Sequence, residues 1–103
     1  MKQNQLMQKS NQNLSENSIL QLQKHSVLRD DLVCFNQITG EVITLNQTGY
    51  LFLMLVNGNR SVNEISICLA NRLKYDTLNV IKDALDFYTV MIQSEIIKIK
   101  ENE

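Results

Sequence analysis

The fold is decided by residues 31–59, which read DLVCFNQITGEVITLNQTGYLFLMLVNGN. Two short segments within them, 32–35 and 41–45, are rich in the β-branched and bulky apolar side chains typical of strands. Between these segments, residues 36–40 end in Gly40, which can adopt the positive φ that a tight turn requires. We therefore predict a β-hairpin.

The apolar stretch after the hairpin predicts a central, buried helix. Residues 46–48 offer side chains that can cap its N-terminus, and residues 50–56 are too uniformly apolar for a surface helix. Gly58 stands where a left-handed C-cap would end this helix, and residues 61–64 have the S-x-x-E arrangement of a capping box. A second helix therefore begins near residue 61.

The remaining segments complete a small α+β domain. Apolar residues at helical spacing continue the second helix, and Asp76 or Thr77 can cap a third helix that runs to about Ser94. A short strand follows at 96–99, whereas residues 18–23 alternate only weakly and fit either an extra strand or a lead-in segment.

The order of these elements predicts a fold class. A short extended piece at residues 27–28 precedes the hairpin, so three strands come before three helices. The predicted fold is α+β, of the winged helix-turn-helix type, with a three-stranded antiparallel sheet followed by three helices.

The composition allows one domain and disfavours several partners. The chain has 103 residues, of which 44% are hydrophobic, which is enough for one modest core. Gln and Asn make up seven of residues 1–13, so we expect residues 1–17 to be a flexible arm and residues 18–100 to form the domain. A formal net charge of -1 gives no overall field toward nucleic acid or a membrane surface. The longest apolar run, 50–56, is far below the roughly 18 to 20 residues that span a bilayer, and a soluble, cytoplasmic protein is expected.

The chain offers little material for catalysis. Its two cysteines, Cys34 and Cys68, have no CxxC spacing and lie among apolar residues, so two soft ligands without a third make a poor zinc site. His25 is the only histidine, and no nucleophile-base pair or glycine-rich phosphate loop is evident. We therefore expect no metal, no cofactor and no catalytic residue, and we do not expect an enzyme.

Several motifs between His25 and Ile99 together resemble the PqqD-like family of recognition elements for ribosomally made, post-translationally modified peptides. The motifs are TGEVITLN at 39–46, TGY at 48–50, NGNRSV at 57–62 with Glu64-Ile65, then Asp83-Ala84, Phe87-Tyr88, Met91-Ile92 and a closing Ile96. The sequence departs from the family at Asn57, where an aspartate is frequent, and at Glu95, where a glycine is frequent.

The resemblance implies a RiPP recognition element, a peptide chaperone that acts in natural product biosynthesis. Such a protein binds the leader segment of a precursor peptide and presents it to a separate maturation enzyme, such as a radical-SAM enzyme, a leader peptidase or a cyclase. In the family the leader is an added strand in a groove walled by the third helix, and the matching edge strand here is 41–45. An edge strand presents unpaired N–H and C=O groups that an extended peptide can satisfy.

The third helix divides into two predicted faces. We assign Ile81, Leu85, Tyr88 and Ile92 to the core, with Phe87 as the main anchor on the groove side. Asp83 and Asp86 can meet basic groups on a leader. The predicted leader-binding residues are Glu41, Val42, Ile43, Thr44, Leu45, Val80, Asp83, Ala84, Phe87 and Met91. An ordinary structural role for this strand and for the apolar residues of the helix remains the alternative.

The alternative function is that of a winged helix-turn-helix DNA-binding transcriptional regulator. Charge disfavours it, because residues 76–95 contain four acidic residues and one lysine, whereas a helix that meets phosphates should carry several basic residues. The precursor peptide and the partner enzyme stay open, and an exposed strand edge is compatible with a monomer or a dimer.

Overall fold

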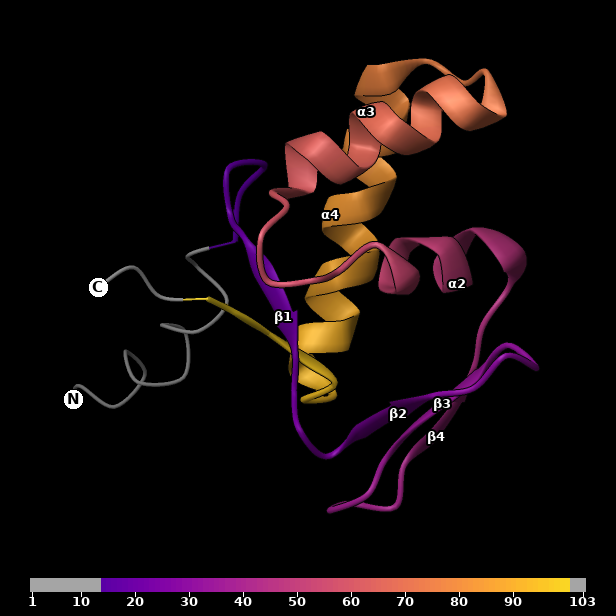
Figure 1. Ribbon diagram of the computed structural model, residues 1–103, viewed down its shortest axis with the longest axis vertical. Coiled ribbons are helices and arrows are strands. Elements are labelled where there is room, and N and C mark those ends of the chain that lie inside the picture. The colour runs from indigo at the N-terminus through magenta and orange to yellow at the C-terminus, as the bar shows by residue number, and fades with distance from the viewer. Residues whose placement is uncertain (1–13, 101–103) are drawn as a thin grey trace, which may run out of the picture.

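The computed structural model describes residues 14–100 of the chain, so most of the arm predicted at 1–17 lies outside the described residues. The fold is mixed α+β, and a three-stranded antiparallel sheet precedes three helices, as the sequence predicts (Figure 1). The elements are β1 (Leu20–Leu22), β2 (Ser26–Leu28), β3 (Val33–Asn36), β4 (Val42–Thr44), α2 (Gln47–Met54), α3 (Val62–Leu73), α4 (Thr77–Gln93) and β5 (Ile97–Ile99).

The predicted hairpin forms two of the three strands of the sheet, with β3 in the centre and β4 at one edge. Its strands β3 and β4 pair antiparallel with Cys34 opposite Ile43, and β2 pairs with the other side of β3. Gly40 has a φ of +82° in the turn, which is the left-handed conformation that glycine adopts without steric cost. Local turn chemistry therefore sets the register of this sheet.

The segment that the sequence left undecided, residues 18–23, contains strand β1. It pairs antiparallel with β5, with Leu20 opposite Ile99, and makes a second sheet of two strands. Leu20 and Ile97 are fully buried, so this pair closes the two ends of the described chain over the core (Figure 1). The pairing depends on a partner far along the chain, which a local pattern does not show.

The helices begin at the capping residues that the sequence indicates. The Asn46 Oδ1 accepts from the Gly49 N–H at 2.7 Å at the start of α2. Ser61 and Glu64 form the predicted capping box at the start of α3, with reciprocal hydrogen bonds of 3.1 Å and 2.8 Å. The Asp76 carboxylate accepts from a backbone N–H in the first turn of α4. Each cap satisfies a donor that the helix itself leaves unpaired.

The core lies between α4 and the elements around it (Figure 1). Tyr88 of α4 is fully buried, and its hydroxyl donates to the Phe52 carbonyl oxygen at 2.7 Å, which joins α4 to α2. Helix α3 packs against α4. Buried apolar residues of all three helices and of both sheets make one continuous cluster. The position of α4 is therefore fixed from several sides.

The predicted core face of α4 is wrong by about one position. Tyr88 is buried as expected, but the other buried apolar residues are Val80, Ala84 and Met91, which are among the residues predicted to bind the leader. The residues expected in the core, Ile81, Leu85 and Ile92, are only partly buried. Both stripes have helical spacing and meet at Tyr88, so periodicity alone does not distinguish them. The elements that surround α4 decide between them.

Candidate functional site

Strand β4 has an open edge. Two hydrogen bonds of its ladder, from the Asn36 N–H to the Glu41 oxygen at 2.9 Å and from the Leu45 N–H to the Leu32 oxygen at 2.8 Å, point toward β3. Because ladder bonds alternate along an antiparallel strand, the N–H and C=O groups of Val42 and Thr44 point away from β3. Among residues 14–100 no strand pairs with this side of β4.

The other edge of the sheet is occupied at its start. The Ser26 hydroxyl, at the beginning of β2, donates to the Ile96 carbonyl oxygen at 2.7 Å. The neighbouring His25 Nε2 lies 2.9 Å from the Glu95 carbonyl oxygen. These contacts hold the segment after α4 against the start of β2, where the Ser26 N–H donates to the Gln23 carbonyl oxygen at 3.0 Å. Among the described residues, no strand lies on the outer side of β4.

Residues at and near the end of α4 contact the chain on both sides of β4. At the start of β4, the Ser94 hydroxyl lies 3.5 Å from the Glu41 carboxylate. Beyond the end of β4, Phe87 reaches Gly49 in the first turn of α2, where an added Cβ would lie 3.1 Å from the Phe87 Cε1. Phe87, Val90 and Ser94 follow one another at helical spacing, and Val90 is half exposed between the two contacts. This face of α4 therefore lies alongside the open edge.

Phe87 is held by an aromatic cluster. Its ring centroid lies 5.5 Å from that of Phe52 and 5.6 Å from that of Tyr88, and the Phe52 and Tyr88 centroids are also 5.6 Å apart. Tilted and edge-on ring pairs at such distances stabilise their arrangement beyond simple burial. The close approach at Gly49 leaves no room there for a larger side chain. The Phe87 ring is thus positioned before any ligand arrives.

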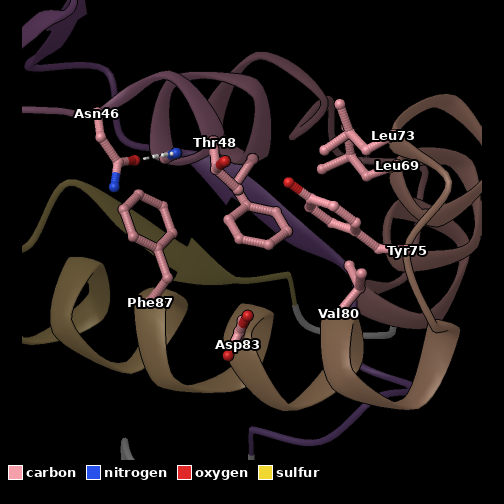
Figure 2. Close-up of a pocket in the computed structure, with 10 residues that line it drawn as sticks. Asn46, Thr48, Leu69, Leu73, Tyr75, Val80, Asp83 and Phe87 are labelled. Atoms are coloured by element: carbon pink, nitrogen blue, oxygen red, sulfur yellow. Dashed lines mark hydrogen bonds between the residues drawn. The ribbon is translucent and has the colours of Figure 1, made fainter.

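A cavity of about 320 Å³ lies between α2, the end of α3 and the first half of α4. Figure 2 shows Phe87 and Asn46 at one end of it, Tyr75 and Val80 at the other, and Asp83 between them on α4. Tyr75 is 61% exposed, so the cavity reaches the surface. It is lined by Asn46, Thr48, Gly49, Phe52, Leu69, Leu73, Tyr75, Val80, Asp83 and Phe87.

Asp83 is the one charged residue among those that line the cavity. It forms no ion pair with another described residue. The ion pair found within residues 14–100 joins Arg29 to Asp31. The other side chains of the lining are apolar, aromatic or neutral and polar. The cavity therefore combines apolar walls with one negative charge.

The structure places the predicted binding residues in three groups. The backbone edge of Glu41–Leu45 is open, with Val42 64% exposed, while the Leu45 side chain is buried and Ile43 is half buried. Val80, Asp83 and Phe87 line the cavity. Ala84 and Met91 are buried in the core and do not line the cavity.

Sequence reasoning missed several residues of the cavity. In the sequence, Asn46, Thr48 and Gly49 belong to a helix cap and to the family motif, and Tyr75 belongs to no motif. A capping side chain shows in the sequence where a helix begins. Whether that side chain lies near α4 depends on tertiary packing, which the local sequence does not show. The exposed tyrosine in the short α3 to α4 turn was the one signal available.

The buried ionisable side chains are held neutral. Burial, and in second place the Glu41 carboxylate, raises the pKa of the Cys34 thiol above its ordinary value of 9.0. Burial also raises the pKa of Tyr88. A buried thiol with a raised pKa is a poor nucleophile.

Within residues 14–100, no group of three or more His, Cys, Asp or Glu side chains is placed to hold a metal ion. None of the helices in that range is long and apolar enough to cross a membrane.

The fold and the site define a small α+β domain in which an open strand edge lies beside a largely apolar cavity. The family model for coenzyme PQQ synthesis protein D (PqqD) matches residues 31–97, well over half of the sequence, and the chain belongs to this family. No curated protein matches the chain at a significant level. Members of the family are non-catalytic accessory proteins, and membership indicates a peptide-binding partner of a modifying enzyme.

Proposed function

We propose that the protein binds the leader segment of a ribosomally synthesised precursor peptide and presents it to a separate modifying enzyme. The observation that carries this proposal is the open edge of β4 beside the Phe87 face of α4, in a chain of the PqqD family. An extended leader would add a strand to β4 and direct alternate side chains toward α4.

Backbone pairing alone would not hold such a leader firmly. The outward groups of Val42 and Thr44 number four, and at a net value of about 0.5 to 1.5 kcal/mol for each hydrogen bond they contribute about 2 to 6 kcal/mol. Ordering a disordered leader costs about 2 to 5 kcal/mol. The two nearly cancel, so net affinity must come from side chains buried against Phe87 and in the cavity. Selectivity therefore belongs to α4 and not to the strand.

The proposal includes the finer fold assignment. In a winged helix-turn-helix domain, the β3–β4 hairpin corresponds to the wing, and α3 and α4 correspond to the two helices that follow one another through a short turn. A DNA-binding regulator would use the same elements, but the exposed charges of α4 are Lys82, Asp83 and Asp86. Two acids and one base on the third helix disfavour contact with phosphates.

Leader binding would take place in the cytoplasm, and the modifying enzyme would carry out the chemistry. A precursor peptide is made in the cytoplasm, so the leader would be captured there. The modifying enzyme, of the radical-SAM, leader peptidase or cyclase type, would then supply the chemistry, with no cofactor on this chain. The free protein can be a monomer or a dimer, since the same edge of β4 serves either state.

The test is a titration of isotope-labelled protein with synthetic leader peptides from short precursor genes encoded near this one. Leader capture predicts saturable amide shifts at residues 41–45 and around Phe87, weakened by Phe87→Ala. If no leader shifts these amides while duplex DNA shifts α3 and α4 in a salt-sensitive way, the regulator takes the place of this proposal.

A sharper variant acts on the edge alone. Thr44→Pro removes an N–H that points away from β3, so pairing within the sheet is retained, as edge positions tolerate proline. The loss of one hydrogen bond should weaken leader binding by roughly 2- to 10-fold. Thr44→Ala keeps the N–H and is the matched control. Equal affinities for the two variants would exclude strand addition at β4.

A further inference from the structure

We infer that the cavity between α2 and α4 receives a lysine or arginine side chain of the bound peptide, with the cationic head at Asp83. This inference rests on the proposed function, because the peptide is the one that pairs with β4. It adds a chemical class to the ligand: a leader with a basic residue at the end of the segment that lies beside β4.

The lining of the cavity matches a long side chain with an apolar stem and a charged head. Phe52, Leu69 and Leu73 supply apolar wall, and Asp83 supplies the charge. Lysine and arginine place their methylene stems on apolar surface and keep their heads beside polar groups. A volume of about 320 Å³ is ample, since an apolar cavity of roughly 150 Å³ holds a benzene molecule.

The aromatic residues favour a cation over a neutral side chain. Tyr75 and Phe87 lie at opposite ends of the cavity, with Asp83 between them (Figure 2). A cation near the face of such a ring is attracted by the ring quadrupole, and an aspartate adds a direct charge partner. A purely apolar side chain would shield the Asp83 carboxylate from water without offering it a partner. An acidic side chain would be repelled.

The position of the cavity follows from the chain itself. Strand β4 ends at Thr44, and two residues later Asn46 lines the cavity while its Oδ1 caps α2. At about 3.3 Å for each strand residue, a peptide paired with β4 reaches the cavity within about two residues of the position opposite Thr44. The remaining Asn46 amide donor faces no acceptor in the described residues and is available to the peptide backbone.

The first experiment uses small probes and does not require a known leader. N-acetyl-lysine N-methylamide and N-acetyl-arginine N-methylamide are titrated at millimolar concentration into labelled protein, with the norleucine and glutamate analogues as comparisons. The expected result is that the two cations shift the amides of Thr48, Asp83 and Phe87, and that Asp83→Asn abolishes the shifts. Equal shifts from norleucine, or none at these positions from either cation, would overturn the inference.

The second experiment uses a leader peptide that the titration of the proposed function has shown to bind. Because Asp83 is exposed, Asp83→Asn should weaken its binding by roughly 2- to 5-fold. Glu16→Gln also removes one exposed carboxylate, from a residue outside the cavity and away from β4, and should leave affinity unchanged. A leader in which the basic residue is replaced by glutamate should regain affinity for Asp83→Lys.

The outcomes separate the two ideas. If the leader shifts the β4 amides but binds Asp83→Asn and wild type equally, leader capture stands and the basic subsite is refuted. If no leader binds while the cationic probes shift the cavity residues in an Asp83-dependent manner, the subsite stands and leader capture at β4 is refuted.

Discussion

Replacing Tyr88 by phenylalanine removes a single oxygen atom from the junction between α2 and α4. Tyr88 is fully buried, and its hydroxyl donates to the Phe52 carbonyl oxygen at 2.7 Å. Phe52 lies in the last turn of α2, where carbonyl oxygens lack a full set of partners within the helix. The neighbouring oxygens of Leu51 and Leu53 accept from backbone N–H groups, so the tyrosine completes this end of α2.

The expected cost is set by the unpaired carbonyl. A buried acceptor that loses its donor destabilises a protein by about 1 to 3 kcal/mol. Taking about 2 kcal/mol, the melting temperature of a domain of this size should fall by about 8 to 16 °C. Thermal unfolding followed by far-UV circular dichroism, with urea unfolding at 25 °C, measures the loss directly.

A matched control removes the same hydroxyl oxygen from a tyrosine on α2. Tyr50 is half buried, and its hydroxyl makes no hydrogen bond to another described residue, so Tyr50→Phe should change stability by less than about 0.5 kcal/mol. If Tyr88→Phe is as stable as Tyr50→Phe, the hydroxyl does not hold α2 against α4.

Two further predictions concern the sheet and the pH dependence of stability. Asn36 is fully buried, and its side chain makes three hydrogen bonds of 3.1 Å or shorter, one of them to the Ser94 carbonyl oxygen. Asn36→Ala should therefore lower the free energy of unfolding, measured in urea, by about 3 kcal/mol. The same change at the exposed Asn59 should lower it little. Because the folded state raises the pKa of Cys34 above 9.0, it holds that proton more tightly than the unfolded chain, and the free energy of unfolding should be unaffected by this group below pH 9 and fall as the pH rises beyond it. Cys34→Ala should reduce this fall, leaving the loss that Tyr88 adds at higher pH, and an unchanged slope in Cys34→Ala would contradict the assignment.

Local signals in the sequence were sufficient where a residue acts on its immediate neighbours. Gly40 has a φ of +82°, as the turn requires. The predicted C-cap at Gly58 is wrong, because α2 ends at Met54 with Leu55 as a right-handed C-cap, and Gly58, with a φ of +83°, lies in the loop that follows. Ser61 and Glu64 bond to each other's backbone across three residues, which the S-x-x-E spacing states directly. These features determine where strands and helices start, because their partners lie within one turn of the chain.

The remaining features depend on partners far along the chain. Strand β1 pairs with β5 across more than seventy residues, and its weak alternation is consistent with either a strand or a loop until that partner is known. The face of α4 shows the same limit, since the stripes through Ala84 and through Leu85 have the same period. The cavity needs Asn46, Tyr75 and Asp83 to meet from three segments, and no spacing in the sequence encodes that meeting.

The short length of β4 explains how an open edge can be retained without indiscriminate pairing. A long, flat and apolar edge would invite pairing with any extended chain, including a second copy of this protein. Strand β4 has three residues and follows the charged Glu41. The hydrogen bonds that its outer backbone groups can form nearly balance the free energy of ordering a peptide, so an arbitrary partner gains little net binding free energy. A peptide that also fills the cavity beside Phe87 and Asp83 gains the burial and charge pairing that the strand cannot supply. The edge thus provides a common mode of binding, and the residues of α4 decide which peptide is held.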